Sequence, residues 1–272
     1  MRLGVHLPQF REPVAGEVLA DAARIAEDAG ADDLWVSDHL LLPVGSERPP
    51  ASFHDPLTVL TWAAAATRRA GLGTSVLVAP YRHPVLLAKA LASLDALSGG
   101  RVIAGLASGW MEPEFRALGV PFAERGRRTD ATIAICRALW SGETSYTWQG
   151  ERVDGVRLLP GPARAGGPPV WIGGNSDAGV RRAARAGDAW HTTISGPERL
   201  AERVAALDRE LAAAGRSRAD LVLSVRVRAG AEGVAELAPR LRELGVDHLL
   251  VDLPAFSLPG LADEVAALRR VV

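Results

Sequence analysis

The chain has 272 residues, 48% of them hydrophobic and 23% charged, which is the composition of a folded globular protein and excludes wholesale disorder. Its 31 basic and 32 acidic residues nearly balance and form no block of like charge, so neither a nucleic-acid footprint nor a polybasic membrane patch is expected. The single cysteine, Cys136, excludes an internal disulfide and a cysteine-built metal site. Without a signal-peptide pattern or a long apolar run, the sequence predicts a cytoplasmic protein.

Short apolar runs alternate along the chain with longer stretches that carry apolar residues at helical spacing. In chain order, they predict eight strand–helix pairs: Leu3–Leu7 with Ala15–Ala29, Leu34–Ser37 with Pro56–Arg68, Leu72–Val78 with Val85–Leu97, Val102–Ala107 with Glu124–Trp140, Val170–Gly173 with Ala178–Ala186, Ala189–His191 with Glu198–Ala214, Leu221–Val227 with Val234–Leu244, and His248–Val251 with Leu261–Arg270. Crossovers of this length imply parallel strands, and eight such pairs predict a (β/α)8 TIM barrel.

The alternative fold, a doubly wound open sheet, would have a glycine-rich turn after the first strand, where this chain has Leu7–Phe10. We therefore expect residues 1–272 to form one barrel domain. Two stretches depart from the plain repeat. Leu41–His54 reads as a long loop after the second strand, and Ser141–Gly167, with Gln149-Gly150 at its centre, predicts a hairpin insertion after the fourth helix.

Several local strings occur together in a distinctive order. They are WVSDH at Trp35–His39, GTSVL at Gly73–Leu77, YRHP at Tyr81–Pro84, LDALSGGR at Leu94–Arg101, GLASGW at Gly105–Trp110, FAERGRR at Phe122–Arg128, PVWIGGNS at Pro169–Ser176 and AGDAWH at Ala186–His191. Over roughly residues 1–230 the chain resembles the bacterial luciferase-like flavin and deazaflavin oxidoreductases, most closely their F420-dependent branch. The resemblance implies a barrel that binds an isoalloxazine or deazaflavin at the carboxyl ends of its strands, for hydride or oxygen chemistry.

The strand-to-helix turn at Gly173, Gly174, Asn175 and Ser176 is the candidate phosphate site of that cofactor. Adjacent glycines let the backbone approach an anion, and the N–H groups of a helix start face it. The resemblance also puts the phosphate end of the cofactor at this turn. Alternatively, Asn175 or Ser176 serves only as a helix cap.

His39 ends the second predicted strand, on the face of a barrel where active sites lie. Its imidazole suits proton transfer near neutral pH, and the resemblance gives it a place beside the cofactor ring. Alternatively, His39 is structural, with Asp38 as its orienting neighbour.

The resemblance implies three further contacts to the ring or the substrate. Ser75-Val76 stands where deazaflavin enzymes of this kind carry a cis peptide that supports the ring. Ser108 and Gly109 allow close approach to a flat ring, and Trp110 forms a pocket wall. Where relatives can carry an acidic carboxylate, this chain has Trp110 and Met111, a departure that argues against a sugar-phosphate dehydrogenase. Glu114 stands just beyond and is therefore a catalytic candidate. Alternatively, Glu114 pairs structurally with Arg125, Arg127 or Arg128.

Three more residues are candidate substrate contacts on the catalytic face. Gln9 follows the first predicted strand, His54 ends the loop after the second, and His191 ends the sixth. No two of the six histidines stand at ligand spacing, so no metal is expected.

The sequence thus predicts hydride transfer between coenzyme F420 and a small organic substrate. An FMN-dependent monooxygenase that uses oxygen is the alternative within the same superfamily, and a non-catalytic barrel that stores a flavin is the alternative from another class. Because relatives commonly pair, a homodimer is the default expectation.

Overall fold

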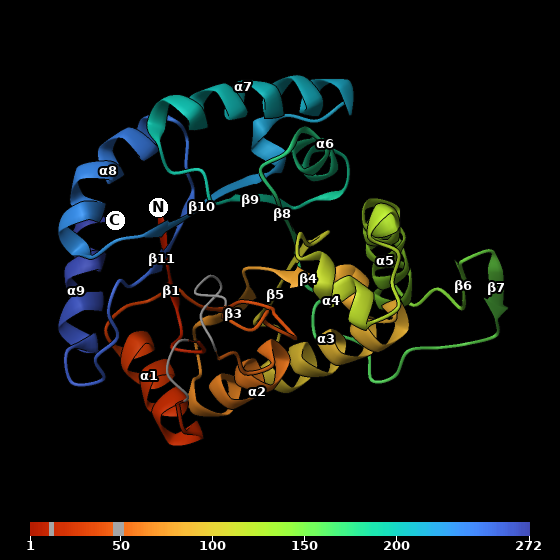
Figure 1. Ribbon diagram of the computed structural model, residues 1–272, viewed down its shortest axis with the longest axis horizontal. Coiled ribbons are helices and arrows are strands. Elements are labelled where there is room, and N and C mark those ends of the chain that lie inside the picture. Colours follow the sequence, from red (N-terminus) through yellow and green to blue (C-terminus); the bar gives the residue numbers. More distant parts are fainter. Residues whose placement is uncertain (11–13, 46–51) are drawn as a thin grey trace.

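A computed structural model describes residues 1–10, 14–45 and 52–272 as a closed barrel of eight parallel strands (Figure 1). Going round the barrel, the strands are β1 (Arg2–His6), β2 (Asp33–Val36), β3 with β4 (Gly71–Thr74 and Leu77–Val78), β5 (Val102–Ala107), β8 (Val170–Gly173), β9 (Ala189–Thr192), β10 (Val222–Arg228) and β11 (His248–Asp252). The barrel closes where β1 pairs with β11, with Arg2 opposite His248. The predicted (β/α)8 architecture is confirmed.

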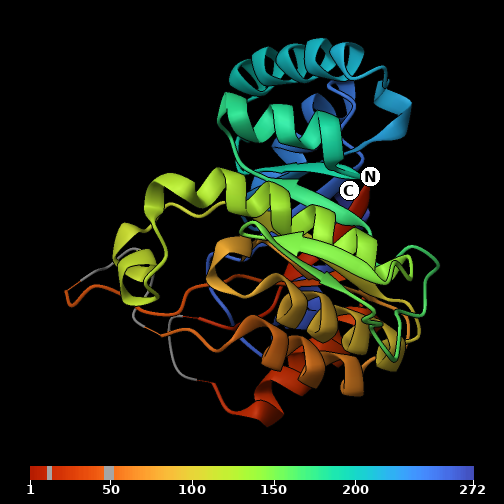
Figure 2. The same cartoon turned by 90° about the vertical axis from the view of Figure 1, so that its right-hand side faces the viewer.

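Helices follow the strands and surround the barrel (Figures 1 and 2). They are α1 (Gly16–Asp28), α2 (Pro56–Ala66), α3 (Pro84–Ser98), α5 (Arg125–Trp140), α6 (Asp177–Ala186), α7 (Pro197–Ala213), α8 (Ala231–Glu243) and α9 (Leu261–Val271). Local sequence explains where they begin. For example, Asp55 accepts a hydrogen bond from the Thr58 amide and Pro56 opens α2, because proline needs no hydrogen-bond acceptor in the first turn. Within the described ranges, no helix combines the length and apolarity that a membrane crossing needs.

Two local predictions need correction. The third strand is not continuous over Leu72–Val78: it breaks into β3 and β4 around a cis peptide bond between Ser75 and Val76. In addition, a short helix that the sequence analysis did not predict, α4 (Glu112–Ala117), follows β5. Six residues are too few for a readable helical period, although Pro113 and the acidic residues of its first turn are helix-start signals.

The insertion after the fourth helix of the repeat is a hairpin, as predicted. Strands β6 (Ser145–Trp148) and β7 (Glu151–Asp154) pair antiparallel, and Gln149 and Gly150 turn the chain with positive φ angles. Figure 1 shows the hairpin beyond α5, well away from the barrel axis. Of the predicted loop Leu41–His54, residues 46–51 lie outside the described ranges. That residues 1–272 form one domain stays a prediction.

Aromatic side chains fill the middle of the barrel. Trp35 of β2 is fully buried, stacks on His191 of β9 with ring centroids 5.5 Å apart, and packs against Trp171 of β8. Gly73 on the neighbouring strand β3 makes room for this indole, because a Cβ at that position would lie 2.4 Å from the ring. This packed layer closes the barrel below the carboxyl ends of the strands, where the candidate site lies.

Candidate active site

A cavity of about 860 Å³ opens at the carboxyl ends of the strands, the face on which TIM-barrel enzymes carry their active sites. Residues at or after the carboxyl end of every strand contribute to its lining, with Phe10 in the segment after β1. The contributing residues are Ser37, Asp38 and His39 after β2, Ser75, Val76 and Val78 around the break between β3 and β4, Ala107–Trp110 from β5, Gly173–Ser176 from β8, His191 and Thr193 from β9, Arg226 and Arg228 from β10, and Asp252 from β11. Ligand sites typically measure about 300–1,000 Å³, so this cavity holds a cofactor-sized molecule.

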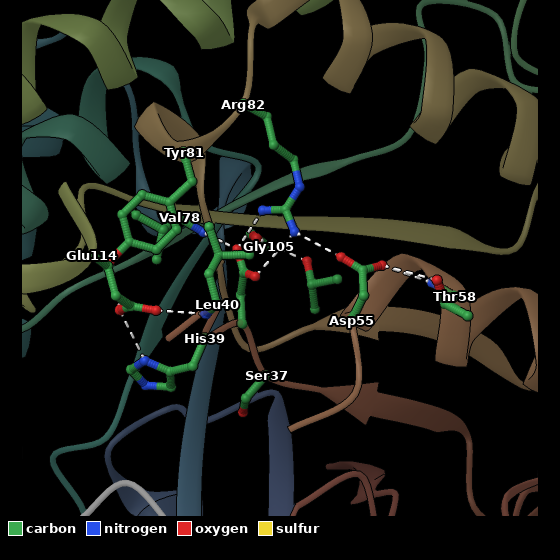
Figure 3. Close-up of polar contacts among 12 residues, drawn as sticks. Ser37, His39, Leu40, Asp55, Thr58, Val78, Tyr81, Arg82, Gly105 and Glu114 are labelled. Atoms are coloured by element: carbon green, nitrogen blue, oxygen red, sulfur yellow. Dashed lines mark hydrogen bonds and ion pairs between the residues drawn. The ribbon is translucent and has the colours of Figure 1, made fainter. Parts of the chain in front are cut away.

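His39 and Glu114 form a hydrogen-bonded pair at one end of this cavity (Figure 3). His39 Nδ1 lies 3.1 Å from Glu114 Oε2, and the carboxylate is fully buried on α4 while 13% of the imidazole is exposed. His39 Nε2 has no hydrogen-bond partner among the residues that the structure describes, so this nitrogen is available to a ligand in the cavity.

Four donors surround the Glu114 carboxylate. Besides His39, Tyr81 donates from 2.7 Å and the backbone amides of Leu40 and Leu41 donate from 2.5 and 3.2 Å. Burial raises the pKa of Glu114, but the hydrogen bonds from His39, Leu40, Tyr81 and Leu41 outweigh it, and the pKa lies below its usual value. Glu114 is therefore ionised at neutral pH, accepts all four bonds, and requires Nδ1 of His39 to carry the proton.

The partners of Glu114 and His39 differ from the structural alternatives that the sequence suggested. Neither Arg125 nor Arg127 nor Arg128 pairs with Glu114: Arg125 donates to the Phe122 carbonyl, and Arg127 and Arg128 pair with Glu124. Asp38 does not orient His39. Sequence neighbours after a strand point to opposite sides, and the chain brings α4 back over His39 from 75 residues away.

Asp38 instead holds Arg82 in place. Its carboxylate accepts from both terminal nitrogens of Arg82, at 2.6 and 3.0 Å, and from the Val78 amide at 2.9 Å, while Asp55 accepts from Arg82 at 3.1 Å. Burial lowers the pKa of the Arg82 guanidinium, but the bond and charge of Asp38 outweigh it and the pKa is raised. These bonds fix the chain just before His39, and the bonds from the Leu40 and Leu41 amides to Glu114 fix it just after.

Aromatic side chains stand around the His39 imidazole. Trp110 is 65% exposed and meets the imidazole edge to face, with ring centroids 5.9 Å apart, and Phe53 does so at 5.1 Å. Phe10 stacks on Phe53 at 5.1 Å. The predicted wall position of Trp110 thus belongs to a larger apolar surface that the sequence analysis did not identify, because Phe10 and Phe53 come from two separate loops.

The predicted phosphate turn lies at the other end of the cavity. Gly173 leaves room for Val76, which a Cβ would approach to 2.7 Å, and Gly174 has a φ of +136°, which other residues rarely adopt. Ser176 caps α6 by accepting from the Gly179 amide, and Asn175 accepts from Thr192 and donates to Thr193. The Ser176 side chain is thus the helix cap, whereas that of Asn175 ties the turn to the end of β9, and the amides of Asn175 and Ser176 find no acceptor among the described residues.

Arg226, which the sequence analysis missed, lies on the floor of the cavity. Its guanidinium is 17% exposed and donates to the Ser37 hydroxyl at 2.9 Å, the Ser75 carbonyl at 3.0 Å and Asp252 at 3.3 Å. The sequence held one signal for this position, a charged residue between two valines of a barrel strand. Because inward-facing and outward-facing residues alternate along such a strand, Arg226 could have been considered for the barrel interior. Arg226 links the ends of β2, β3, β10 and β11.

His191 also lies on the floor, but both of its ring nitrogens are engaged. Nε2 lies 2.8 Å from the Ser75 hydroxyl and Nδ1 lies 2.8 Å from the Ser224 hydroxyl. Burial holds the pKa of His191 well below its ordinary value, and nearby His248 and Arg226 lower it further, so the ring is neutral. Its predicted substrate contact is therefore limited to the ring surface.

Gln9 and His54 do not line the cavity. Gln9 is fully buried and ties two segments together, because it donates to the Ser37 and His54 carbonyls and accepts from the Ser37 amide. His54 Nε2 lies 3.1 Å from the Val14 carbonyl. Ser108, in contrast, lines the cavity and accepts from the Thr129 hydroxyl at 3.1 Å. No cluster of three or more histidine, cysteine or acidic side chains suited to a metal ion occurs in the described ranges.

The barrel and the polar cavity at its carboxyl-terminal face define an enzyme-like TIM-barrel protein. The chain belongs to the luciferase-like monooxygenase family, whose model matches residues 1–242. It is similar to an uncharacterised protein of Mycobacterium tuberculosis, with 30% identity over 262 residues that cover 91% of this chain and 90% of that protein. By family, it is a luciferase-like oxidoreductase.

Two relatives have stated activities. The F420-dependent glucose-6-phosphate dehydrogenase of Kineococcus radiotolerans is 32% identical over 227 residues, covering 80% of this chain and 65% of that protein. The FMNH2-dependent dimethylsulfone monooxygenase of Pseudomonas putida is 30% identical over 198 residues, covering 71% and 53%. Among solved structures, an F420-dependent secondary alcohol dehydrogenase superposes with a TM-score of 0.83 at 17% identity, over 100% of this chain and 98% of that one, and this likeness shows the shared fold.

Proposed function

We propose that the protein is an F420-dependent oxidoreductase that transfers a hydride between the deazaflavin and a small organic substrate. The observation that carries the proposal is the continuity of one cavity of about 860 Å³ from the glycine turn before α6 to His39. This volume suits a tricyclic ring together with a small second molecule. The relative from Kineococcus radiotolerans, named for its F420 dependence, adds support.

The residues at the α6 end fit an anionic cofactor group. The Asn175 and Ser176 amides have no acceptor among the described residues, and the start of α6 adds its own N–H groups and the positive end of its dipole. A Cβ built on Gly174 would meet only the Gly179 Cα, at 3.6 Å, so the space beside this glycine is open. Arg125 lines the same end and supplies positive charge, whereas the charge of Arg182 is balanced by Asp130. We assign the phosphate to Gly173–Ser176.

The middle of the cavity would hold the ring. Ser75 and Val76 on one side, and Ser108 and Gly109 on another, present backbone and small side chains to a flat molecule. When bound, reduced F420 supplies a hydride from carbon C5 of its ring. Arg226 keeps Ser75 in position through its bonds to the Ser75 carbonyl and hydroxyl, so the ring support does not depend on β3 alone.

His39 would handle the proton that accompanies the hydride. In the direction of reduction, the Nε2 position gives a proton to the substrate, and in the direction of oxidation it removes one. Glu114 holds the imidazole in one orientation and offsets the positive charge of its protonated form. Phe53 and Trp110 beside His39 favour a substrate with an apolar portion.

FMN is the second candidate cofactor, favoured by the relative named as an FMNH2-dependent monooxygenase. Titrating the purified, cofactor-free protein with F420 and with FMN, each followed by its absorbance and fluorescence, separates the two. We expect saturable F420 binding and at least about tenfold weaker FMN binding, a difference of about 1.4 kcal/mol. Tight FMN binding without affinity for F420 would refute the proposal in favour of the monooxygenase.

A further inference from the structure

A second cavity, of about 640 Å³, lies outside the barrel between α5 and α6, which Figures 1 and 2 show side by side. Its lining is rich in arginine and has little acidic charge to match. The lining residues with charge are Arg137, Arg181, Arg182, Arg185 and Arg216 together with Asp130 and Asp188. We call this cavity the α5–α6 groove.

The two helices that form the groove concentrate positive charge. Together α5 and α6 contain seven arginines and two aspartates, a net charge of +5, in a chain whose overall net charge is −1. The remainder of the chain is therefore acidic. A local field of this kind attracts an anionic ligand toward one flank of the molecule and raises its association rate.

Three of the five groove arginines are tied into the protein. Arg182 pairs with Asp130 at 2.6 Å, Arg137 pairs with Asp188 at 2.9 Å, and Arg216 donates to backbone carbonyls, including that of Ala184. These bonds hold the walls of the groove, and two of them balance the charges of Arg182 and Arg137 with carboxylates.

Arg181 and Arg185 are different. Both are exposed and stand four residues apart on α6, so they lie one turn apart on the same side of the helix. Arg181 has a long contact of 3.5 Å to Glu210, and Arg185 has neither a hydrogen bond nor an ion pair to any described residue. They offer two charged guanidinium groups to a ligand with two or more anionic groups.

The groove continues the cofactor cavity. Ala178 and Arg182, at the start of α6, line both cavities, immediately beside the turn Gly173–Ser176. From there the groove follows α6, whose ten residues span about 15 Å at 1.5 Å per residue. A ligand whose phosphate lies at the turn can therefore extend its remaining anionic groups along Arg181 and Arg185.

We infer that the α5–α6 groove binds an oligocarboxylate extension of the cofactor beyond its phosphate. Of the two candidate cofactors, F420 carries such an extension, an oligoglutamate tail, whereas FMN ends at its phosphate. The inference rests on the proposed function and adds that the tail contributes to affinity, through Arg181 and Arg185. It also gives the chain a physical means of preferring F420 over FMN.

The test measures binding by fluorescence titration, without any substrate. The ligands are F420 with its glutamate tail, the same deazaflavin phosphate with the glutamates removed, and FMN. We expect the tail to strengthen binding about tenfold, the effect of two partly screened ion pairs. The double variant Arg181→Gln/Arg185→Gln should lose this difference and leave the affinity for the tailless compound and for FMN unchanged.

A double variant on other helices serves as the control for net charge. Arg209→Gln/Arg270→Gln removes two exposed arginines from α7 and α9, and should keep the tenfold difference. Raising the salt concentration from 0.1 to about 1 M should reduce the difference in the wild type, because the Debye length shortens from about 10 to 3 Å.

The outcomes separate this inference from the proposed function. Equal wild-type affinity for the tailed and tailless compounds would overturn the groove assignment while leaving F420 as the cofactor. Equal weakening of all three ligands by the α6 variant would assign the two arginines to the phosphate instead, and would also overturn it. If neither deazaflavin binds, the proposed function itself fails.

Discussion

Glu114 sets the protonation pattern of His39, and the variant Glu114→Gln tests this directly. Glutamine keeps the shape of the side chain and one carbonyl oxygen, which can still accept from the Leu40 and Leu41 amides. In the wild type, Tyr81 and His39 donate to the second carboxylate oxygen. In the variant, the NH2 group of the glutamine takes the place of that oxygen and faces the same two side chains. Tyr81 can rotate its hydroxyl, but Nδ1 of His39 must become an acceptor. The ring proton therefore moves to Nε2, the nitrogen that faces the cavity.

The magnitude follows from the bonds that change. Hydrogen bonds to a charged group contribute about 1.5–3 kcal/mol each and neutral ones about 0.5–1.5, so weakening the bonds from His39 and Tyr81 costs about 2–4 kcal/mol of folding free energy. For a chain of this size, that corresponds to a melting temperature lower by about 5–10 °C. Glu114→Gln should therefore stay folded at room temperature, which allows its spectra to be measured.

The pH dependence has a defined sign. Burial raises the pKa of Glu114, but its hydrogen bonds outweigh this effect and leave the pKa below its ordinary value of 4.5. The stability that the carboxylate contributes is therefore fully present above about pH 4.5, and is lost as the pH falls through the lower folded-state pKa. The stability gap between wild type and Glu114→Gln should be constant from pH 6 to 8 and should narrow below about pH 4.5.

Nitrogen-15 NMR of the imidazole side chains is the assay, because it reports the tautomer without any substrate. At a pH where the ring is neutral, His39 should be the Nδ1–H tautomer in the wild type and in Tyr81→Phe, which keeps the carboxylate, and the Nε2–H tautomer in Glu114→Gln. Once a substrate is in hand, His39→Ala should slow single-turnover hydride transfer by about 10²–10⁴-fold. An unchanged His39 tautomer in folded Glu114→Gln would refute the reasoning. If His39→Ala were less stable but still transferred the hydride at a near-normal rate, the role of His39 would be structural only.

Three further outcomes are expected. Gly174→Val should weaken cofactor binding, because a β-branched residue at a φ of +136° distorts the turn Gly173–Ser176. Gly215→Val, also at a positive φ (+69°) but remote in sequence from that turn, should leave binding intact, and an equal loss in both would contradict the assignment. Burial lowers the pKa of His191 and of His248, so the unfolded chain binds more protons below about pH 6.5. The free energy of unfolding should therefore fall from pH 7 to 5.5, by up to about 1.4 kcal/mol per pH unit per histidine, and His191→Asn should reduce that slope. Burial raises the pKa of the Cys136 thiol to about 12, so iodoacetamide should label it only in denaturant, and rapid labelling of the native protein would contradict its burial.

Much of the barrel could be predicted from the chain alone. The eight strands are short apolar runs because parallel strands in a barrel are buried on both faces, and the helices between them repeat apolar residues at helical spacing. The hairpin at Ser145–Asp154 has alternating residues around a Gln-Gly turn, so local sequence predicts it as well. Such features depend on near neighbours in the chain, and the structure agrees with the prediction for all of them except the third strand, which is broken into β3 and β4.

The backbone of the strand-to-helix turn at Gly173–Ser176 belongs to the same group, while its binding of a phosphate stays a prediction. A glycine pair between a strand and a helix specifies its backbone locally, and the structure has this turn where the sequence placed it. The cis peptide bond between Ser75 and Val76, which the structure has, was expected only through the family resemblance, since the residues around it by themselves are typical of an ordinary buried strand.

The partners of the polar side chains were decided by the tertiary structure. Glu114 meets His39 across 75 residues, Arg226 meets Ser37 across 189, and Asp38 meets Arg82 across 44. Barrel closure sets these pairings, because it brings the carboxyl ends of strands from both halves of the chain to one face. A single sequence contains the residue types but not these distances, whereas the helical and strand periods act over a few residues and can be read from it directly.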